Sequence, residues 1–341
     1  MLFEELVISI MKAVNLERTV SSPFHLIKGK KSGQTIQDIG YYRLYPYFAV
    51  MQKLDKNAYD DVIQSLFARN LLRPNEQVID LSEAALKMQI PASKLNGWKY
   101  RGNEILFLNR LSLIVQTLSH TSQSEYSFDP VHNAVDLQGW VKEYLVRINY
   151  RDPETARRFK KELHDSLIAA NVIEDNKMML MQRLTGLRLS GLTWEQIAAG
   201  KGLHPLDVQL AVIETLHAWL EVLESGDFQL FSPLLNGVVQ RSSLTESAER
   251  TDKLFKQGLS LDEIAAVRQL KTSTIEDHFV ELAMNDPAFD YTVFIPQDLF
   301  RSITDISARR NTKRLRDIKE MLPQANYFQI RLALAVKEDV L

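Results

Sequence analysis

Two stretches, SGLTWEQIAAGKGLHPLDV (190–208) and QGLSLDEIAAVRQLKTSTI (257–275), match each other position by position at a fixed offset of 67 residues. The matching positions are mostly small or apolar, and the clearest pairs are Gly191 with Gly258, Leu192 with Leu259, Ile197 with Ile264, Leu203 with Leu270, and Val208 with Ile275. Self-similarity at a fixed period is typical of a repeated supersecondary unit. The repeat therefore sets the architecture of this half of the chain.

Each copy also contains the signals that start and stop helices. Thr193 is followed three positions later by Gln196, and Ser260 by Glu263, so each pair predicts a capping box at a helix start. The glycine before each box can end a preceding helix in the left-handed conformation, and the alanine pair inside each helix allows close helix packing. A short helix, a turn and a second helix form the helix-turn-helix pattern, which occurs here twice.

The rest of the chain also favours helices. It has 13 glycines and 11 prolines in 341 residues, and long stretches show a period of 3.6 residues. One predicted helical face consists of Leu137, Val141, Tyr144, Leu145 and Ile148. Asp152-Pro153-Glu154 predicts the start of the next helix, because it combines an N-cap residue, a first-turn proline and an acid that suits the helix dipole.

The first 90 residues show a different order of predicted elements. Helical periods cover 2–16, 35–50 and 57–69, and the segment LLRPNEQVIDL (71–81) predicts a two-stranded hairpin with a turn at Pro74-Asn75-Glu76. Three helices followed by a small hairpin are typical of a winged helix.

These patterns predict a mainly α-helical protein with four segments. The expected segments are a winged-helix-like domain at 1–90, a helical middle at 91–180, a first helix-turn-helix unit at 181–235, and a second helix-turn-helix domain at 236–341.

Composition narrows the possible functions. Lys and Arg together (41) nearly balance Asp and Glu (43), so any attraction for nucleic acid must be local. The absence of cysteine excludes disulfides, thiolate metal sites and a cysteine nucleophile. Glu4 and Glu5 near the start do not fit a signal peptide, and no apolar run reaches the roughly 18–20 residues that cross a bilayer, so a cytoplasmic protein without membrane contact is expected.

The second helices of the two units are poorly suited to reading DNA bases. They contain no Lys or Arg but five carboxylates: Asp207 and Glu214 in one, and Glu276, Asp277 and Glu281 in the other. A negative helix is repelled by DNA, whereas base readout needs donors. We therefore expect these helices to serve packing or protein contacts, although Thr272 and Ser273 at a helix start could hold one phosphate without reading bases.

Positive charge is concentrated in two other runs. RTVSSPFHLIKGKKSGQ (18–34) contains Lys28, Lys30 and Lys31 and no acid, and RRNTKRLR (309–316) forms a second acid-free run. The cations of the second run, placed near an expected helix start, are Arg309, Arg310, Lys313, Arg314 and Arg316. Basic side chains at a helix start suit a phosphate, so both runs are predicted DNA contacts. The alternative is that they only form solvated surfaces.

No motif for catalysis is found. GKKS (29–32) lacks the upstream glycine and the buried strand of a phosphate-binding loop. The seven histidines show no metal-ligand spacing, and neither a nucleophile elbow nor a dinucleotide-binding loop is present. No catalytic, cofactor-binding or metal-binding residue is therefore expected, and the protein is expected not to be an enzyme.

Both ends of the chain resemble known families. LFKQGLSLDEIAAVRQLKTSTIEDHFVELA (254–283) and LRDIKEMLPQANYFQIRLALA (315–335) resemble the helix-turn-helix domain at the C-terminus of many bacterial RecQ-type helicases. SPFHLIKGKKSGQTIQDI (22–39) resembles the start of the YpbB family, Firmicute proteins encoded beside a RecQ-like helicase. The resemblance implies an accessory protein that supplies in trans a domain that other bacteria fuse to the helicase.

The expected function is thus a non-enzymatic partner of a RecQ-like helicase that contacts DNA independently of sequence in repair or recombination. Two alternatives remain open at this point. One is a transcriptional regulator that binds an operator through the N-terminal winged helix, and the other is a protein-interaction scaffold that never touches DNA.

Overall fold

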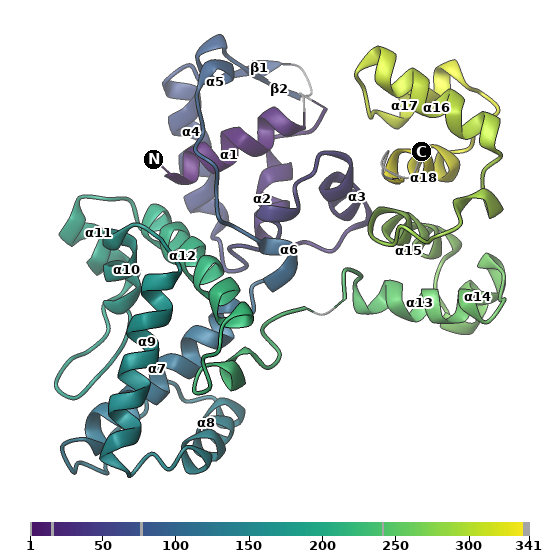
Figure 1. Ribbon diagram of the computed structural model, residues 1–341. Coiled ribbons are helices and arrows are strands. Elements are labelled where there is room, and N and C mark those ends of the chain that lie inside the picture. The colour runs from purple at the N-terminus through teal and green to yellow at the C-terminus, as the bar shows by residue number, and fades with distance from the viewer. Residues whose placement is uncertain (1, 15–16, 76–77, 241, 337–341) are drawn as a thin grey trace. The chain divides into compact units, whose positions relative to one another are not determined.

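Helices dominate the structure, as the sequence predicted (Figure 1). The computed structural model describes residues 2–14, 17–75, 78–240 and 242–336. Its elements in chain order are α1 (Leu2–Ala13), α2 (Ser21–Lys28), α3 (Gly33–Tyr41), the 3-10 turn η1 (Tyr45–Tyr47), α4 (Lys56–Ala68), β1 (Leu72–Asn75), β2 (Val78–Leu81), α5 (Glu83–Lys87), α6 (Gly97–Tyr100), α7 (Glu104–Thr121), α8 (Val135–Arg147), α9 (Pro153–Ala169), α10 (Glu174–Met181), α11 (Trp194–Lys201), α12 (Pro205–Ser225), η2 (Ser232–Leu235), α13 (Glu246–Lys256), α14 (Leu261–Arg268), α15 (Thr272–Asn285), η3 (Tyr291–Val293), α16 (Gln297–Arg310), α17 (Leu315–Met321) and α18 (Tyr327–Ala335).

The chain divides into two compact units. Unit 1 consists of residues 1–6, 49–52 and 90–240, and unit 2 of residues 7–48, 53–89 and 241–341. The segments predicted at 91–180 and 181–235 thus lie within one unit, whereas residues 7–48 and 53–89, with most of the N-terminal helices and the hairpin, share the other unit with the C-terminal helices. The division into four domains at 1–90, 91–180, 181–235 and 236–341 remains a prediction.

Unit 1 is built around α12, a helix of 21 residues whose side chains are mostly buried. Trp219 near its middle is fully buried, and its indole N–H donates a hydrogen bond of 2.9 Å to the Ser166 hydroxyl on α9. Phe107 of α7 meets the same indole edge-on. Because α12 supplies the core, it cannot enter a DNA groove without unfolding unit 1. This agrees with the packing role expected from its acidic and apolar composition.

Both predicted helix-turn-helix units are present. The Thr193–Gln196 and Ser260–Glu263 capping boxes are complete, and each opens a helix of eight residues, α11 or α14. Each of these helices ends in the left-handed conformation, at Gly202 in one and at Gln269 in the other. The second helices, α12 and α15, then begin 67 residues apart, so the sequence offset is kept in the structure.

The two glycines that precede the capping boxes serve different purposes. Gly258 has a φ of 89° and ends α13 in the left-handed region, as predicted. Gly191 does not have a positive φ. A Cβ atom there would lie 2.4 Å from the Arg183 carbonyl oxygen, so this glycine permits a close approach between backbone segments.

The N-terminal hairpin is also confirmed. β1 and β2 pair antiparallel, with Leu72 opposite Leu81 and Asn75 opposite Val78. Pro74 and Asn75 therefore end the first strand rather than forming the turn, and Glu76, the third residue of the predicted turn, lies outside the described residues. The helix predicted at 35–50 is shorter than expected, because Arg43 at a φ of 55° leaves the helical region soon after α3.

Helix α2 lies outside the helical segments that the sequence predicted. Its N-cap residue Val20 makes no side-chain capping bond, so the sequence lacks the usual start signal. Like α11 and α14, α2 has eight residues and ends at a left-handed residue, Gly29. Ser32 then caps α3 by accepting a hydrogen bond from the backbone N–H of Thr35. The α2–α3 pair thus repeats the form of the two predicted helix-turn-helix units.

None of the helices within the described ranges is both long and apolar enough to cross a membrane.

Candidate nucleic-acid interface

Helices α3 and α15 of unit 2 pack side by side in parallel. A Cβ atom at Gly33 would lie 2.3 Å from a carboxylate oxygen of Asp277, and one at Gly40 would lie 2.4 Å from the terminal methyl of Met284. The two glycines are seven residues apart on α3, and the two opposing residues are seven apart on α15. Residues at this spacing lie on the same helical face, so the helices run in the same direction and in register. Their N-termini therefore lie at the same end.

This shared end carries hydroxyls and ammonium groups. Thr272 and Ser273 open α15 and are exposed, and Lys271 before them makes no side-chain capping bond. Thr272 lies five residues, roughly 7.5 Å of helix rise, before Asp277. Lys30 and Lys31 are exposed in the turn that leads into α3. We call Lys30, Lys31, Lys271, Thr272 and Ser273 the α3–α15 surface.

Helix N-termini attract anions, since their first backbone N–H groups lack partners within the helix and the helix dipole is positive there. Two parallel helices that start at the same end bring two such termini together. The surrounding lysines add full positive charges. The arrangement is therefore suited to phosphate groups.

Positive charge continues onto the neighbouring helices. The ammonium groups of Lys28 and Lys56 lie 5.3 and 5.6 Å from the centre of the Phe24 ring. Burial, and then the nearby charges of Lys30 and Lys56, lower the pKa of His25. Lys28 thus borders the α3–α15 surface, and Lys56 is a neighbour that the sequence analysis missed because it lies outside the basic run.

The acidic residues of α15 are neutralised within the protein. Arg331 of α18 donates to Glu276 at 2.6 Å and also to Asp277, and Gln37 of α3 donates to Asp277 at 3.2 Å. Burial raises the pKa of both carboxyl groups, and Arg331 opposes that shift. The acids that discourage DNA contact in the sequence therefore hold α3, α15 and α18 together.

The second predicted basic run does not lie at one helix start. Arg309 and Arg310 occupy the last turn of α16, Asn311 ends that helix with a φ of 48°, and α17 begins only at Leu315. For Arg309 and Arg310 the expectation of a phosphate site at a helix N-terminus is wrong, because α16 continues through both. Arginines in the last turn instead suit the negative end of the helix dipole. Arg314 and Arg316 do lie at the start of α17.

Within this run, Arg316 pairs with Glu320 at 2.9 Å, and both side chains are largely exposed. Arg314 is exposed at the N-cap of α17. The DNA contacts predicted for these arginines remain predictions.

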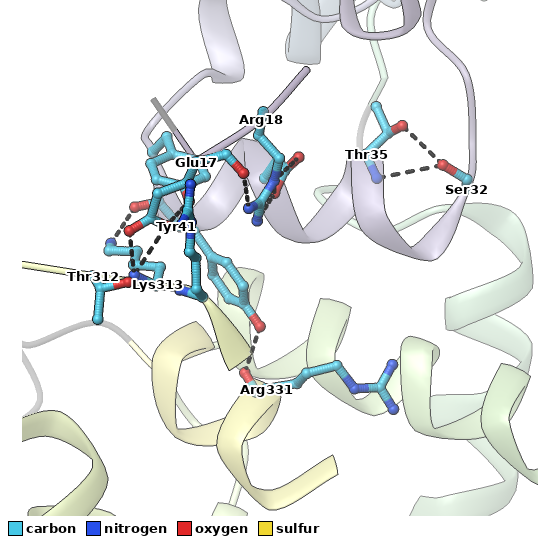
Figure 2. A network of polar contacts seen from close by, with 11 residues as sticks. Glu17, Arg18, Ser32, Thr35, Tyr41, Thr312, Lys313 and Arg331 are labelled. Atoms are coloured by element: carbon cyan, nitrogen blue, oxygen red, sulfur yellow. Dashed lines mark hydrogen bonds and ion pairs between the residues drawn. The ribbon is translucent and has the colours of Figure 1, made fainter. Parts of the chain in front are cut away.

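Lys313 lies inside the protein's own polar network (Figure 2). Its backbone N–H donates to both carboxylate oxygens of Glu17 at 2.9 and 3.0 Å. Its ammonium group donates to the carbonyl oxygen of Tyr41 and lies 5.6 Å from the centre of the Tyr42 ring. A phosphate would have to compete with these contacts, so we leave Lys313 out of the proposed interface.

The position of Lys313 has an electrostatic reason. A cavity of about 650 Å³ is lined by the C-terminal ends of α3, α16 and α18, including Tyr41, Asn311 and Ala335. Helix C-termini carry free carbonyl groups and a partial negative charge. The half-buried ammonium group of Lys313 at this convergence compensates that charge.

Comparison with known proteins places the chain in a family. Residues 247–334, which include α14 to α17, match the model of a helix-turn-helix domain. Over 97% of the chain and 96% of the relative, it is 31% identical to Protein YpbB of Bacillus subtilis (strain 168). The chain belongs to the YpbB family. No solved structure showed significant similarity to it.

In this YpbB-family chain, the structure brings Lys30 and Lys31 to the same helix end as Thr272 and Ser273, although the two pairs are far apart in the sequence. Lys271 joins them. The sequence does show Lys271 as a basic residue directly before a helix start. It was not predicted as a contact because the acidic residues later in α15 argued against DNA binding by this helix.

Proposed function

We propose that the protein is a non-enzymatic DNA-binding accessory factor that contacts the phosphate backbone through the α3–α15 surface. In this proposal it acts beside a RecQ-like helicase in DNA repair or recombination, and it docks onto that motor. The observation that carries the proposal is the parallel contact of α3 with α15, which joins two helix N-termini, three lysines and two hydroxyls.

The same geometry argues against sequence-specific reading by the helices that usually perform it. α3 is covered by α15 and α18, as the Gly33, Gly40 and Tyr41 contacts indicate. α12 forms the core of unit 1. The alternative of an operator-binding regulator therefore has less support than backbone contact, which needs no base-reading helix.

The DNA contact can be tested by replacing Lys30, Lys31 and Lys271 together with alanine. We expect weaker binding to duplexes of unrelated sequence. The log–log salt slope should fall by up to about 0.9 for each phosphate that the variant no longer neutralises. Fluorescence anisotropy titrations at two or more salt concentrations measure both quantities.

A matched control replaces three exposed lysines elsewhere, Lys87, Lys142 and Lys161, with alanine. It removes the same net charge but should keep most of the affinity and the slope. Replacing Arg309 and Arg310 tests the other predicted run in the same assay. Equal affinity and slope for the wild type and the Lys30/Lys31/Lys271 variant would refute the proposed interface.

The helicase contact needs a separate experiment. The full chain should co-purify with the RecQ-like helicase of the same organism after nuclease treatment. Loss of the complex on nuclease treatment would mean that DNA bridges the two proteins. Absence of a complex under all conditions would remove the helicase from the proposal while leaving the DNA contact testable.

A further inference from the structure

A second surface lies in unit 1, in a groove of about 630 Å³. Its walls are the C-terminal half of α7, the first half of α9 and the end of α10, together with the turn that precedes α9. This volume falls within the roughly 300–1,000 Å³ typical of sites that take a ligand or a few side chains. None of the residues of the α3–α15 surface lines it.

The floor of the groove is apolar. Leu118, Phe159 and Leu184 are buried beneath it, and Leu163 and Met181 are half-buried along its sides. A concave surface with a mostly apolar lining and a few charged groups at its edge is typical of binding sites. Methionine in the wall allows the groove to adapt to different apolar side chains.

The rim is positively charged. Arg151, Arg157 and Lys160 line it and are exposed. The acidic residue in the lining, Asp152, accepts a hydrogen bond of 2.9 Å from the backbone N–H of Glu154 and so serves as the cap of α9. Arg157 meets Glu154 in an exposed pair at 3.3 Å, which offers weak competition for an incoming carboxylate.

An apolar floor with a cationic rim complements a peptide that combines large apolar side chains with flanking carboxylates. We propose that this groove binds an acidic amphipathic segment of a partner protein. The apolar side chains of that segment enter between α7 and α9, and its carboxylates contact Arg151, Arg157 and Lys160.

Single-stranded DNA is the competing occupant, since Tyr126 and Tyr150 also line the groove and aromatic rings can stack on bases. The apolar floor disfavours it. The floor residues Leu118, Phe159 and Leu184 offer no side-chain donor or acceptor, so a base buried against them would leave its polar edge groups unpaired, which is unfavourable.

The test is a selection of short random peptides displayed on phage against the full-length protein. Ala156, on the groove side of α9, is replaced by tryptophan to fill the groove, and this variant serves for counter-selection. We expect enriched peptides to contain Leu, Phe or Trp flanked by Asp and Glu. A dye-labelled copy of the most enriched peptide should bind R157E/K160E about tenfold more weakly than wild type.

The control variant R158E/K142E reverses two exposed charges outside the groove lining and should change the affinity by less than about twofold at 0.15 M salt, where charges are screened within about 8 Å. Three results would overturn the proposal. They are no peptide that distinguishes wild type from A156W, enriched peptides without acidic residues, and a dye-labelled oligothymidine that binds wild type but not R157E/K160E. Failure here leaves the Lys30/Lys31/Lys271 experiment unaffected, because the two sites share no residue.

Discussion

Single side chains in unit 2 show how the same charge can serve either a ligand or the fold. Lys313 lies in a basic run, yet its ammonium group compensates the convergent C-termini of three helices. Lys30 and Lys31 lie in the other run and remain exposed at a helix start. Sequence composition cannot separate these cases, because the carbonyl groups around Lys313 come from segments that are far away in the chain.

Replacing Lys313 with methionine keeps most of the side-chain length but removes the charge. We expect the free energy of unfolding of unit 2 to fall by roughly 1–3 kcal/mol, since a carbonyl group no longer accepts a hydrogen bond from a charged donor. Urea titration followed by far-UV circular dichroism measures the change. The control Arg316→Met breaks an exposed pair and should cost at most about 1 kcal/mol; equal destabilisation by the two variants would contradict the role of Lys313.

His278 on α15 gives unit 2 a dependence on pH. Its Nδ1 atom lies 2.8 Å from the Thr251 hydroxyl oxygen and 3.3 Å from a guanidinium nitrogen of Arg268. Because a guanidinium group can only donate, this arrangement favours an Nδ1 without a proton, as in the neutral imidazole. Burial, and then the charge of Arg268, lower its pKa from 6.5 to about 4. Between these values the unfolded chain binds a proton that the folded protein does not. The stabilising contribution is therefore present above pH 6.5 and is lost as the pH falls towards 4.

We expect His278→Gln to flatten the fall in stability between pH 6.5 and 4, by at most about 1.4 kcal/mol per pH unit. The measurement is the free energy of unfolding at several pH values, compared with wild type. His164→Gln, at a largely exposed position, is the control. An unchanged pH profile in the His278 variant would show that this imidazole does not titrate differently on unfolding.

At the scale of elements, local signals were sufficient to place several helix starts. Both capping boxes and the Asp152-Pro153 start act within one turn, and all three were predicted and found. α2 was missed because it has no capping bond at its start. The α3–α15 contact could not be predicted, since its glycines meet side chains more than 200 positions away and no periodicity links them. For the same reason the sequence indicated Lys30, Lys31, Thr272 and Ser273 as possible contacts, but it indicated neither Lys271 nor that these residues lie at the same helix end.

Gly40→Ala and Gly139→Ala test that contact with the same chemical change. Nothing lies within 4 Å of a Cβ atom at Gly139 on α8, so that variant should gain roughly 0.5–1 kcal/mol from helix propensity. At Gly40 the added methyl meets Met284, and overpacking should outweigh the gain, with a net destabilisation of up to about 3 kcal/mol. Urea denaturation compares the two variants. Adding Met284→Ala should recover part of the stability that Gly40→Ala removes, and a stabilised Gly40→Ala protein would contradict the close packing of α3 on α15.

For the molecule as a whole, the two units can be observed separately. All four tryptophans, Trp98, Trp140, Trp194 and Trp219, lie in unit 1. Indole fluorescence therefore reports on unit 1, whereas circular dichroism reports on the helices of both.

We expect the urea transitions followed by these two probes not to coincide, because separate units need not unfold together. Gly40→Ala should shift the dichroism curve while leaving the fluorescence midpoint in place. Ser166→Ala, which removes the bond to the Trp219 indole, should shift the fluorescence midpoint. Coincident curves that move together in both variants would show a single cooperative transition.

Unit 2 is built from segments that lie on both sides of residues 90–240 in the sequence, and this affects how the chain folds during translation. A hydrogen bond between Gln37 and Asp277 spans 240 positions of the chain, and all of unit 1 from residue 90 onward is encoded between them. During translation, α3 is synthesised long before α15. By the time α15 is synthesised, residues 90–240 are complete. The face of α3 that packs on α15 therefore has to wait for its native partner until residues 272–285 have been synthesised. Early folding of the intervening residues would shorten the effective loop that has to close. The DNA-facing surface proposed above would then assemble after residues 90–240, so a chain truncated before Lys271 would lack it even where unit 1 had folded.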